Sequence, residues 1–107
     1  MRRAARTDGN HEATRDYLRR AGWCVHDTSA VGGGFPDLVV SRDGFTALVE
    51  VKNGAKSPSR IKLTLLQETF AKGWKGVCIK ALSPEDAEKQ LNLAEQYRAS
   101  HGKDTCK

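Results

Sequence analysis

Residues 32–52 of this 107-residue chain read GGGFPDLVVSRDGFTALVEVK. Two runs that are rich in apolar and β-branched residues, 38–40 and 45–51, have the composition of β-strands. The turn expected between them, at 41–44, contains the dipeptide Asp-Gly, which favours a β-hairpin. The rest of the chain is interpreted around this hairpin.

Three charged residues in the hairpin form a candidate metal-dependent catalytic cluster. Glu50 and Lys52 are two residues apart, so on a strand they leave the same face. Asp37 precedes the first strand and can approach Glu50 across an antiparallel pair. The two carboxylates offer oxygen ligands to Mg²⁺, which usually takes one or two of them, and the Val51 carbonyl is a third candidate ligand. Lys52 would then position an attacking water or help to deprotonate it, and would stabilise charge on phosphorus.

The same residues also fit a purely structural interpretation. Asp37 can be a turn residue at the entry to a strand. Glu50 and Lys52 can be an exposed ion pair worth under about 1 kcal/mol. A buried charge is costly unless it is paired or bound to a metal, so two charged groups on one face of an apolar hairpin need an explanation.

The remaining sequence predicts an α/β domain. The expected elements are a helix at 8–21, a strand at 23–26, the hairpin, a helix from 64 to 73, a strand at 76–80 and a helix from 83 to 99. Thr64 and Gln67 fit a capping box, and Ser83-Pro84 fits a helix start. The apolar side expected for the helix from 64 consists of Leu65, Leu66, Thr69 and Phe70, and the buried stripe expected for the last helix consists of Ala87, Leu91, Ala94 and Tyr97. The order α-β-β-β-α-β-α places a helix between the third and fourth strands, so a crossover is needed. We therefore expect a mixed sheet with helices on its faces.

Composition indicates one globular domain at 8–99, with a disordered basic tail at 1–7 and a second tail at 100–107. Hydrophobic residues make up 38% of the chain and charged residues 29%, and no apolar run approaches the roughly 18 residues of a membrane span. The three cysteines show no zinc-site spacing, so we expect reduced thiols and a cytoplasmic protein, with Cys24 and Cys78 in the core.

The net charge of +5 is unevenly distributed. Residues 52–75 contain six basic residues and one acidic residue, whereas residues 81–100 contain four acidic and two basic ones. This asymmetry suggests a polyanionic partner on the basic side, although a solvated lysine-rich surface would look the same. The candidate DNA contacts are Arg15, Arg19, Lys56, Arg60 and Lys62.

The hairpin and its neighbours closely resemble the PD-(D/E)xK nuclease superfamily, in particular the small stand-alone VRR-NUC-type domains of phages and bacteria. The matching residues are Gly33-Gly34-Phe35-Pro36-Asp37-Leu38, Leu48-Val49-Glu50-Val51-Lys52, Leu63-Thr64-x-x-Gln67, Asp8-x-Asn10 and Ser83-Pro84-Glu85-Asp86-Ala87. The resemblance covers roughly residues 6–92 and implies a restriction-endonuclease-like core. It also implies that Asp37 and Glu50 bind Mg²⁺ or Mn²⁺, that Lys52 is the catalytic lysine and that Gln67 approaches the site.

The resemblance leaves two roles open. The superfamily often supplies another acid from its first helix, where Asn10, His11 and Glu12 are candidates and Glu12 is the only carboxylate. Gln67 can instead bond the backbone of Thr64 as part of the capping box. For Trp23 and Trp74, at the ends of elements, we expect core or dimer contacts rather than base stacking.

The function expected is that of a metal-dependent endodeoxyribonuclease. The resemblance implies a homodimer that cuts branched DNA, as a Holliday junction resolvase does, in a phage or its bacterial host. We find no zinc finger and no helix-turn-helix signal, so recognition through backbone charge and shape is expected. The alternatives are a non-catalytic nucleic-acid-binding module on the same fold and a nicking nuclease subunit that needs a partner protein.

Overall fold

The computed structural model describes residues 9–53 and 62–101. Its elements are α1 (Gly9–Arg20), β1 (Cys24–Asp27), β2 (Leu38–Arg42), β3 (Phe45–Val51), α3 (Leu65–Gly73), β4 (Val77–Ala81) and α4 (Pro84–His101). The four strands form one sheet in the order β1-β2-β3-β4, antiparallel except for the parallel pair β3 and β4. The described chain is thus a mixed α/β fold with a mixed sheet, as predicted. Residues 54–61 lie outside the described residues, so the complete order of elements stays a prediction.

The central hairpin turns on two residues. Asp43 (φ 52°) and Gly44 (φ 83°) both have positive φ, as a two-residue type I′ turn requires. Ser41 and Arg42 belong to β2, so the prediction of a four-residue turn at 41–44 is wrong. Short turns of this kind match the twist of the flanking strands, and strand pairing therefore continues up to the Asp-Gly dipeptide.

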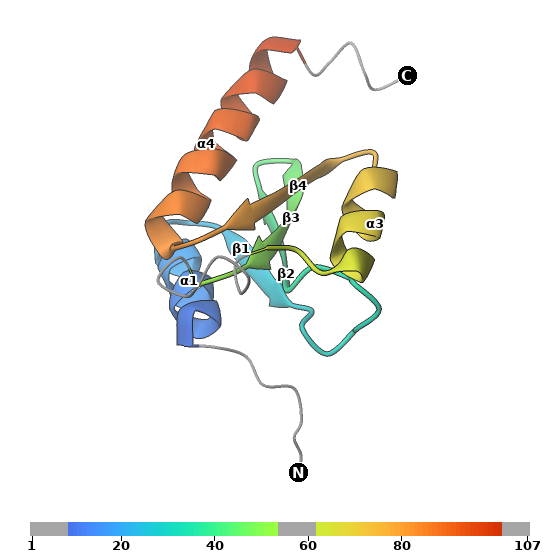
Figure 1. Cartoon of the computed structure of the whole chain (residues 1–107). Coiled ribbons are helices and arrows are strands. Elements are labelled where there is room, and N and C mark those ends of the chain that lie inside the picture. Colours follow the sequence, from blue (N-terminus) through green and yellow to red (C-terminus); the bar gives the residue numbers. More distant parts are fainter. Residues whose placement is uncertain (1–8, 54–61, 102–107) are drawn as a thin grey trace.

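The helices lie on both faces of the sheet (Figure 1). Helices α1 and α4 cover one face and α3 covers the other. Alternate residues of β3 point to the first face, where they join a core cluster with Leu18 of α1 and Leu91 of α4. Leu48 and Glu50 point to the opposite face, toward α3, and both are buried there.

The residues of the candidate site lie at one end of the sheet. The register pairs Asp27 with Leu38, Leu38 with Val49, and Val51 with Ala81. The ends of β1, β3 and β4 therefore meet the start of β2 at the same edge of the sheet. Residues that are far apart in sequence are brought together there by strand pairing.

The outer parts of two helices are more exposed than their apolar patterns predict. In α3 no described residue is buried, and Leu65 and Leu66 are 77% and 61% exposed. In α4 the predicted stripe is buried at Ala87 and Leu91, but Tyr97 is 66% exposed because the second half of the helix extends beyond the sheet (Figure 1). Within the described ranges, no helix combines the length and apolar character that a bilayer crossing requires.

The prediction that Cys24 and Cys78 lie in the core is wrong for Cys24, and Cys78 is only partly buried. Cys24 at the start of β1 is exposed, because the alternation of that strand buries its neighbour Val25 instead. Cys78 of β4 is half-buried on the face that α3 covers. Cys106 lies outside the described residues.

Candidate active site

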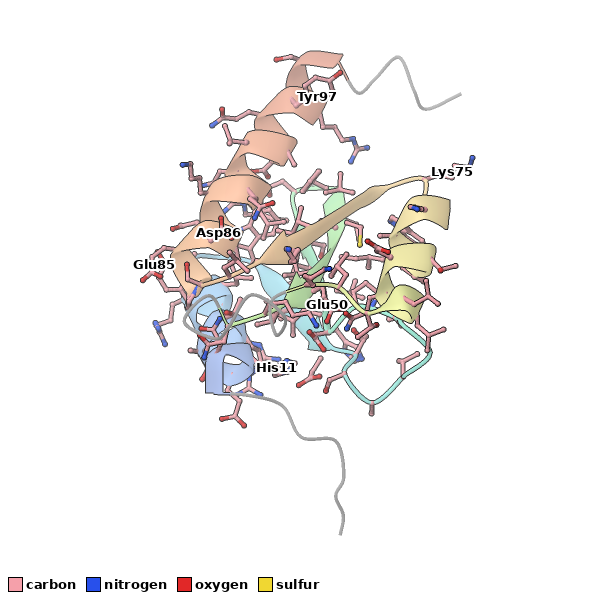
Figure 2. The ribbon with its side chains drawn as sticks, in the orientation of Figure 1. His11, Glu50, Lys75, Glu85, Asp86 and Tyr97 are labelled. Atoms are coloured by element: carbon pink, nitrogen blue, oxygen red, sulfur yellow. The ribbon has the colours of Figure 1, made fainter. Side chains whose placement is uncertain are left out.

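Asp37 and Glu50 face each other across the β2–β3 pair. The pairing of Leu38 with Val49 puts Asp37, one residue before β2, opposite Glu50 near the end of β3. One Asp37 oxygen, Oδ2, accepts a hydrogen bond of 2.9 Å from the Val51 backbone N–H, which ties this carboxylate to the neighbouring strand. Glu50 is only 6% exposed, and Figure 2 shows it on the α3 side of the sheet. The exposed ion-pair interpretation of Glu50 is therefore wrong.

The environment of Glu50 opposes its ionisation. Burial is the largest cause, followed by the negative charge of Asp37 and a hydrogen bond between the two carboxyl groups, and together they raise the pKa of Glu50 to about 8. The charge of Lys52 acts in the opposite direction without cancelling these effects. Two carboxylates in one poorly hydrated place repel each other, and a cation between them would relieve that repulsion.

Gln67 performs both of the roles that its sequence position left open. Its Oε1 accepts a hydrogen bond from the Thr64 backbone N–H at 2.9 Å, and the Thr64 hydroxyl accepts one from the Gln67 N–H at 3.2 Å, which completes the capping box. Its Nε2 donates to Oε2 of Glu50 at 2.7 Å. The start of α3 is thereby fixed to the buried carboxyl group.

Lys52 directly follows β3, and its backbone is held on both sides. Its N–H donates to the Ala81 carbonyl at 2.8 Å, and its carbonyl accepts from Asn10 Nδ2 at 2.8 Å. The same Asn10 amide also donates to the Leu82 carbonyl at 3.1 Å. Asn10 thus joins α1 to the ends of β3 and β4, where it fixes the backbone that carries Lys52.

The other first-helix candidates behave differently from one another. His11 is 3% exposed, and its Nε2 donates to Oδ2 of Asp27 at 2.9 Å, at the end of β1. Figure 2 shows His11 on α1, the helix that covers the face opposite α3. Glu12 is exposed on the first turn of α1. Among the three, Asn10 makes the contact with the segment that bears the predicted catalytic lysine, and a metal-binding role for Glu12 stays a prediction.

A small cavity lies beside Glu50, between the sheet and α3. Its lining includes Gly34, Gln67, Cys78 and Lys80. Lys80 pairs with Glu50 in the parallel register of β3 and β4, so both residues belong to the same face. The sequence predicted a core position for Cys78 and did not indicate that Cys78 or Lys80 would lie beside Glu50. The sequence predicted that both residues belong to a strand, GVCIK, but it did not predict that this strand would pair with β3.

The donor set for a metal is small. Among the described residues, no group of three or more His, Cys, Asp or Glu side chains is placed to hold a metal ion. Asp37 and Glu50 remain as a pair of carboxylates, which fits a hard cation that keeps most of its water ligands. The Val51 carbonyl stays a predicted third ligand.

The predicted DNA contacts are only partly described. Arg15 forms an ion pair with Asp16 at 2.9 Å, and Arg19 donates to the Val25 carbonyl at 3.0 Å, so both guanidinium groups already have partners in the protein. Lys62 is exposed before α3. Lys56 and Arg60 lie outside the described residues.

Comparison of the chain with protein-family models, with curated proteins and with solved structures finds no match.

Proposed function

We propose that this protein is a metal-dependent endodeoxyribonuclease of the PD-(D/E)xK kind, with a restriction-endonuclease-like core. One observation carries the proposal: Glu50 is 6% exposed, shares its environment with Asp37, and has a raised pKa. A buried acid beside another acid destabilises a fold, so its presence at the end of the central strand favours a functional explanation.

The carboxylate pair suits Mg²⁺ or Mn²⁺. Asp37 and Glu50 would hold the cation through their oxygens. The positive charge would offset the burial and the repulsion from Asp37, which together raise the pKa of Glu50. When bound, such an ion supplies Lewis-acid activation of a phosphodiester and of a water molecule. The residues at this site therefore fit the cation that the resemblance to PD-(D/E)xK nucleases implies.

The protein's own groups have distinct tasks in this scheme. Lys52, held in place by the Ala81 and Asn10 contacts, stabilises the negative charge that develops on the phosphate. Gln67 keeps one oxygen of Glu50 oriented through its 2.7 Å hydrogen bond. Asn10 is a positioning residue, because it contacts the backbone of Lys52 rather than any reacting group.

The proposed substrate is branched DNA such as a Holliday junction, and the proposed assembly is a homodimer. Lysines dominate the segment that follows the site, so phosphate contacts would position the DNA without reading its sequence. A two-fold dimer would present two such sites to a two-fold junction.

The first prediction tests catalysis with a panel of four-way junction, flap, fork and duplex DNA in Mg²⁺ and in Mn²⁺. Wild-type protein should cut at least the junction, and Lys52→Ala or Glu50→Gln should reduce the rate by at least a hundredfold, because each removes charge stabilisation or a metal ligand. Lys89→Ala, which removes an exposed lysine of α4, is the matched control and should cleave normally.

Two other outcomes would support the alternative functions instead. Tight binding without cleavage of any of these substrates would identify a non-catalytic DNA-binding module. A monomer in sedimentation that only nicks one strand would identify a subunit of a larger nuclease.

A further inference from the structure

An aromatic ladder runs from the candidate site to the surface of the protein. Phe35, two residues before Asp37, packs edge-to-face on Phe70 of α3, with ring centroids 5.1 Å apart. Phe70 in turn stacks on Trp74, with centroids 5.4 Å apart and ring planes 20° from parallel. Phe35, Phe70 and Trp74 together form the aromatic ladder.

Trp74 is the exposed end of the aromatic ladder and is held in place. Its N–H donates to the Ala71 carbonyl at the end of α3, and its Nε1 edge lies so close to Gly76 that a Cβ there would be 2.9 Å away. One ring face is stacked on Phe70, yet the residue is 41% exposed. The other tryptophan, Trp23, is 3% exposed in the core. An indole that is fixed and still accessible is arranged to receive a flat ligand, since little conformational freedom remains to be lost.

The charge around Trp74 selects the kind of ligand. Between residues 62 and 80 the described chain has four lysines (Lys62, Lys72, Lys75 and Lys80) and one acid, Glu68. All four lysines are exposed, and two of them closely flank Trp74 in sequence. A flat π-surface among cations matches an unpaired base with its phosphates. A second protein chain would need an apolar surface with fewer charges at its centre.

The position of Trp74 also agrees with a strand that passes the carboxylates. Gln67 contacts Glu50 at the start of α3, and Trp74 follows seven residues later, about 10 Å along the helix axis. A strand in duplex geometry advances about 3.4 Å per nucleotide, so this distance spans at most about three nucleotides. Figure 2 shows Glu50 and Lys75 at opposite ends of α3, so this helix joins the carboxylates to the lysine-flanked tryptophan.

We propose that Trp74 is a stacking platform for an unpaired DNA base within about three nucleotides of the phosphodiester at Asp37 and Glu50. The inference rests on the proposed function for the identity of the strand, and it adds single-stranded character near the cleavage point to the substrate. It also revises the sequence-based expectation, which did not favour base stacking for this residue.

The second prediction tests the stacking without cleavage, by titrating the full-length protein with a short oligothymidylate strand in EDTA. Binding should quench tryptophan emission, because Trp74 stacks on a base while buried Trp23 keeps a constant signal. Trp74→Ala should weaken binding between about fivefold and a hundredfold and abolish the quenching. Trp74→Phe keeps a ring and should retain most of the affinity.

Two controls make this result specific. Leu93 of α4 is also apolar and is 58% exposed. The Leu93→Ala variant should therefore bind the strand as wild type does. A blunt hairpin duplex with the same number of phosphates should bind Trp74→Ala and wild type equally. Circular dichroism shows whether each variant is folded.

The stacking proposal is overturned if a folded Trp74→Ala binds the strand as wild type does, or if binding leaves the tryptophan emission of wild type unchanged. It is also overturned if the substitution changes only self-association in sedimentation, which would assign Trp74 to a contact with a second copy. If wild type binds the strand through Trp74 but cuts no DNA, the stacking inference stands and the nuclease proposal fails. If the protein cuts DNA and the Trp74 substitutions do not affect binding, the nuclease proposal stands and the stacking inference fails.

Discussion

Glu50 is the residue where folding and the proposed chemistry conflict most. Its carboxyl group is buried beside Asp37, and burial followed by that neighbouring charge raises its pKa. An acid whose folded-state pKa is raised binds its proton more tightly in the folded protein than in the unfolded chain. Stability therefore falls as pH rises from the unfolded pKa, 4.5, through about 8, where the folded state also loses the proton.

The third prediction follows from this sign. In EDTA, the thermal midpoint of wild type should fall between pH 5 and pH 8, and Glu50→Gln should remove that fall because the amide cannot ionise while it still accepts from Gln67. Each pKa unit corresponds to about 1.4 kcal/mol, so the variant should be the more stable protein at pH 8. Added Mg²⁺ should raise the midpoint of wild type at pH 8 and leave Glu50→Gln nearly unchanged. Equal pH profiles for the two proteins would show that Glu50 ionises freely.

Asn10 shows what residue-level sequence patterns leave out. Three adjacent candidates on the first helix were indistinguishable by spacing, and the only carboxylate, Glu12, is exposed. Asn10 instead contacts the carbonyls of Lys52 and Leu82, 42 and 72 residues away in sequence. Such contacts depend on where α1 docks against the strand ends, and local periodicity carries no information about docking.

At the level of elements, α3 is joined to the rest of the protein by few interactions. It has no buried residue, and its described contacts run through the Gln67–Glu50 hydrogen bond and the packing of Phe70 on Phe35. A third contact is the close approach of Gly34 to the Leu66 backbone. Gly34 has φ 88° and no Cβ, and both properties are needed for the loop to lie this near the helix.

The fourth prediction compares Gly34→Ala with Gly33→Ala. A Cβ at Gly34 would lie 2.5 Å from the Leu66 carbonyl oxygen, whereas one at Gly33 would meet nothing within 4 Å, although both glycines have positive φ. Gly33→Ala should cost about 1–2 kcal/mol for the left-handed backbone alone. Gly34→Ala should cost about 1–3 kcal/mol more for overpacking, and should lower cleavage further by moving Gln67 away from Glu50. Urea denaturation measures the first effect, and equal losses in the two variants would mean that the loop and α3 are not in close contact.

Element-level prediction succeeded where local signals are strong. Strand β3 and the capped start of α3 were predicted with their bounds, because Asp43-Gly44 and Thr64-x-x-Gln67 act within a few residues. The apolar side predicted for α3 was not buried, since burial depends on what faces the helix. The pairing of Asp37 with Glu50 was predictable from the hairpin, but the link from Gln67 to Glu50 required the crossover to bring α3 over that face of the sheet.

For the whole molecule, the charges of residues 62–101 are unevenly distributed between the two faces of the sheet. Helix α4 carries all four acids of residues 81–100, while Lys62, Lys72 and Lys75 lie in α3 or next to its ends, on the other face. The proposed DNA-binding side is thus the α3 side, where Glu50 also points. The lysines on the α3 side would attract a polyanion to that side of the protein.

The fifth prediction is therefore a strong salt dependence of junction binding. If about six phosphates are neutralised, affinity should fall around a thousandfold between 50 and 200 mM salt, because condensed counterions are released on binding. Fluorescence anisotropy of a labelled four-way junction in EDTA measures this slope. Lys62→Ala should remove about one phosphate contact and so reduce the slope of log affinity against log salt by about one. Lys89→Ala on α4 should leave this slope unchanged. A nearly salt-independent affinity would contradict recognition through the phosphate backbone, and an equal loss of slope in both variants would show that the DNA is not confined to the α3 side.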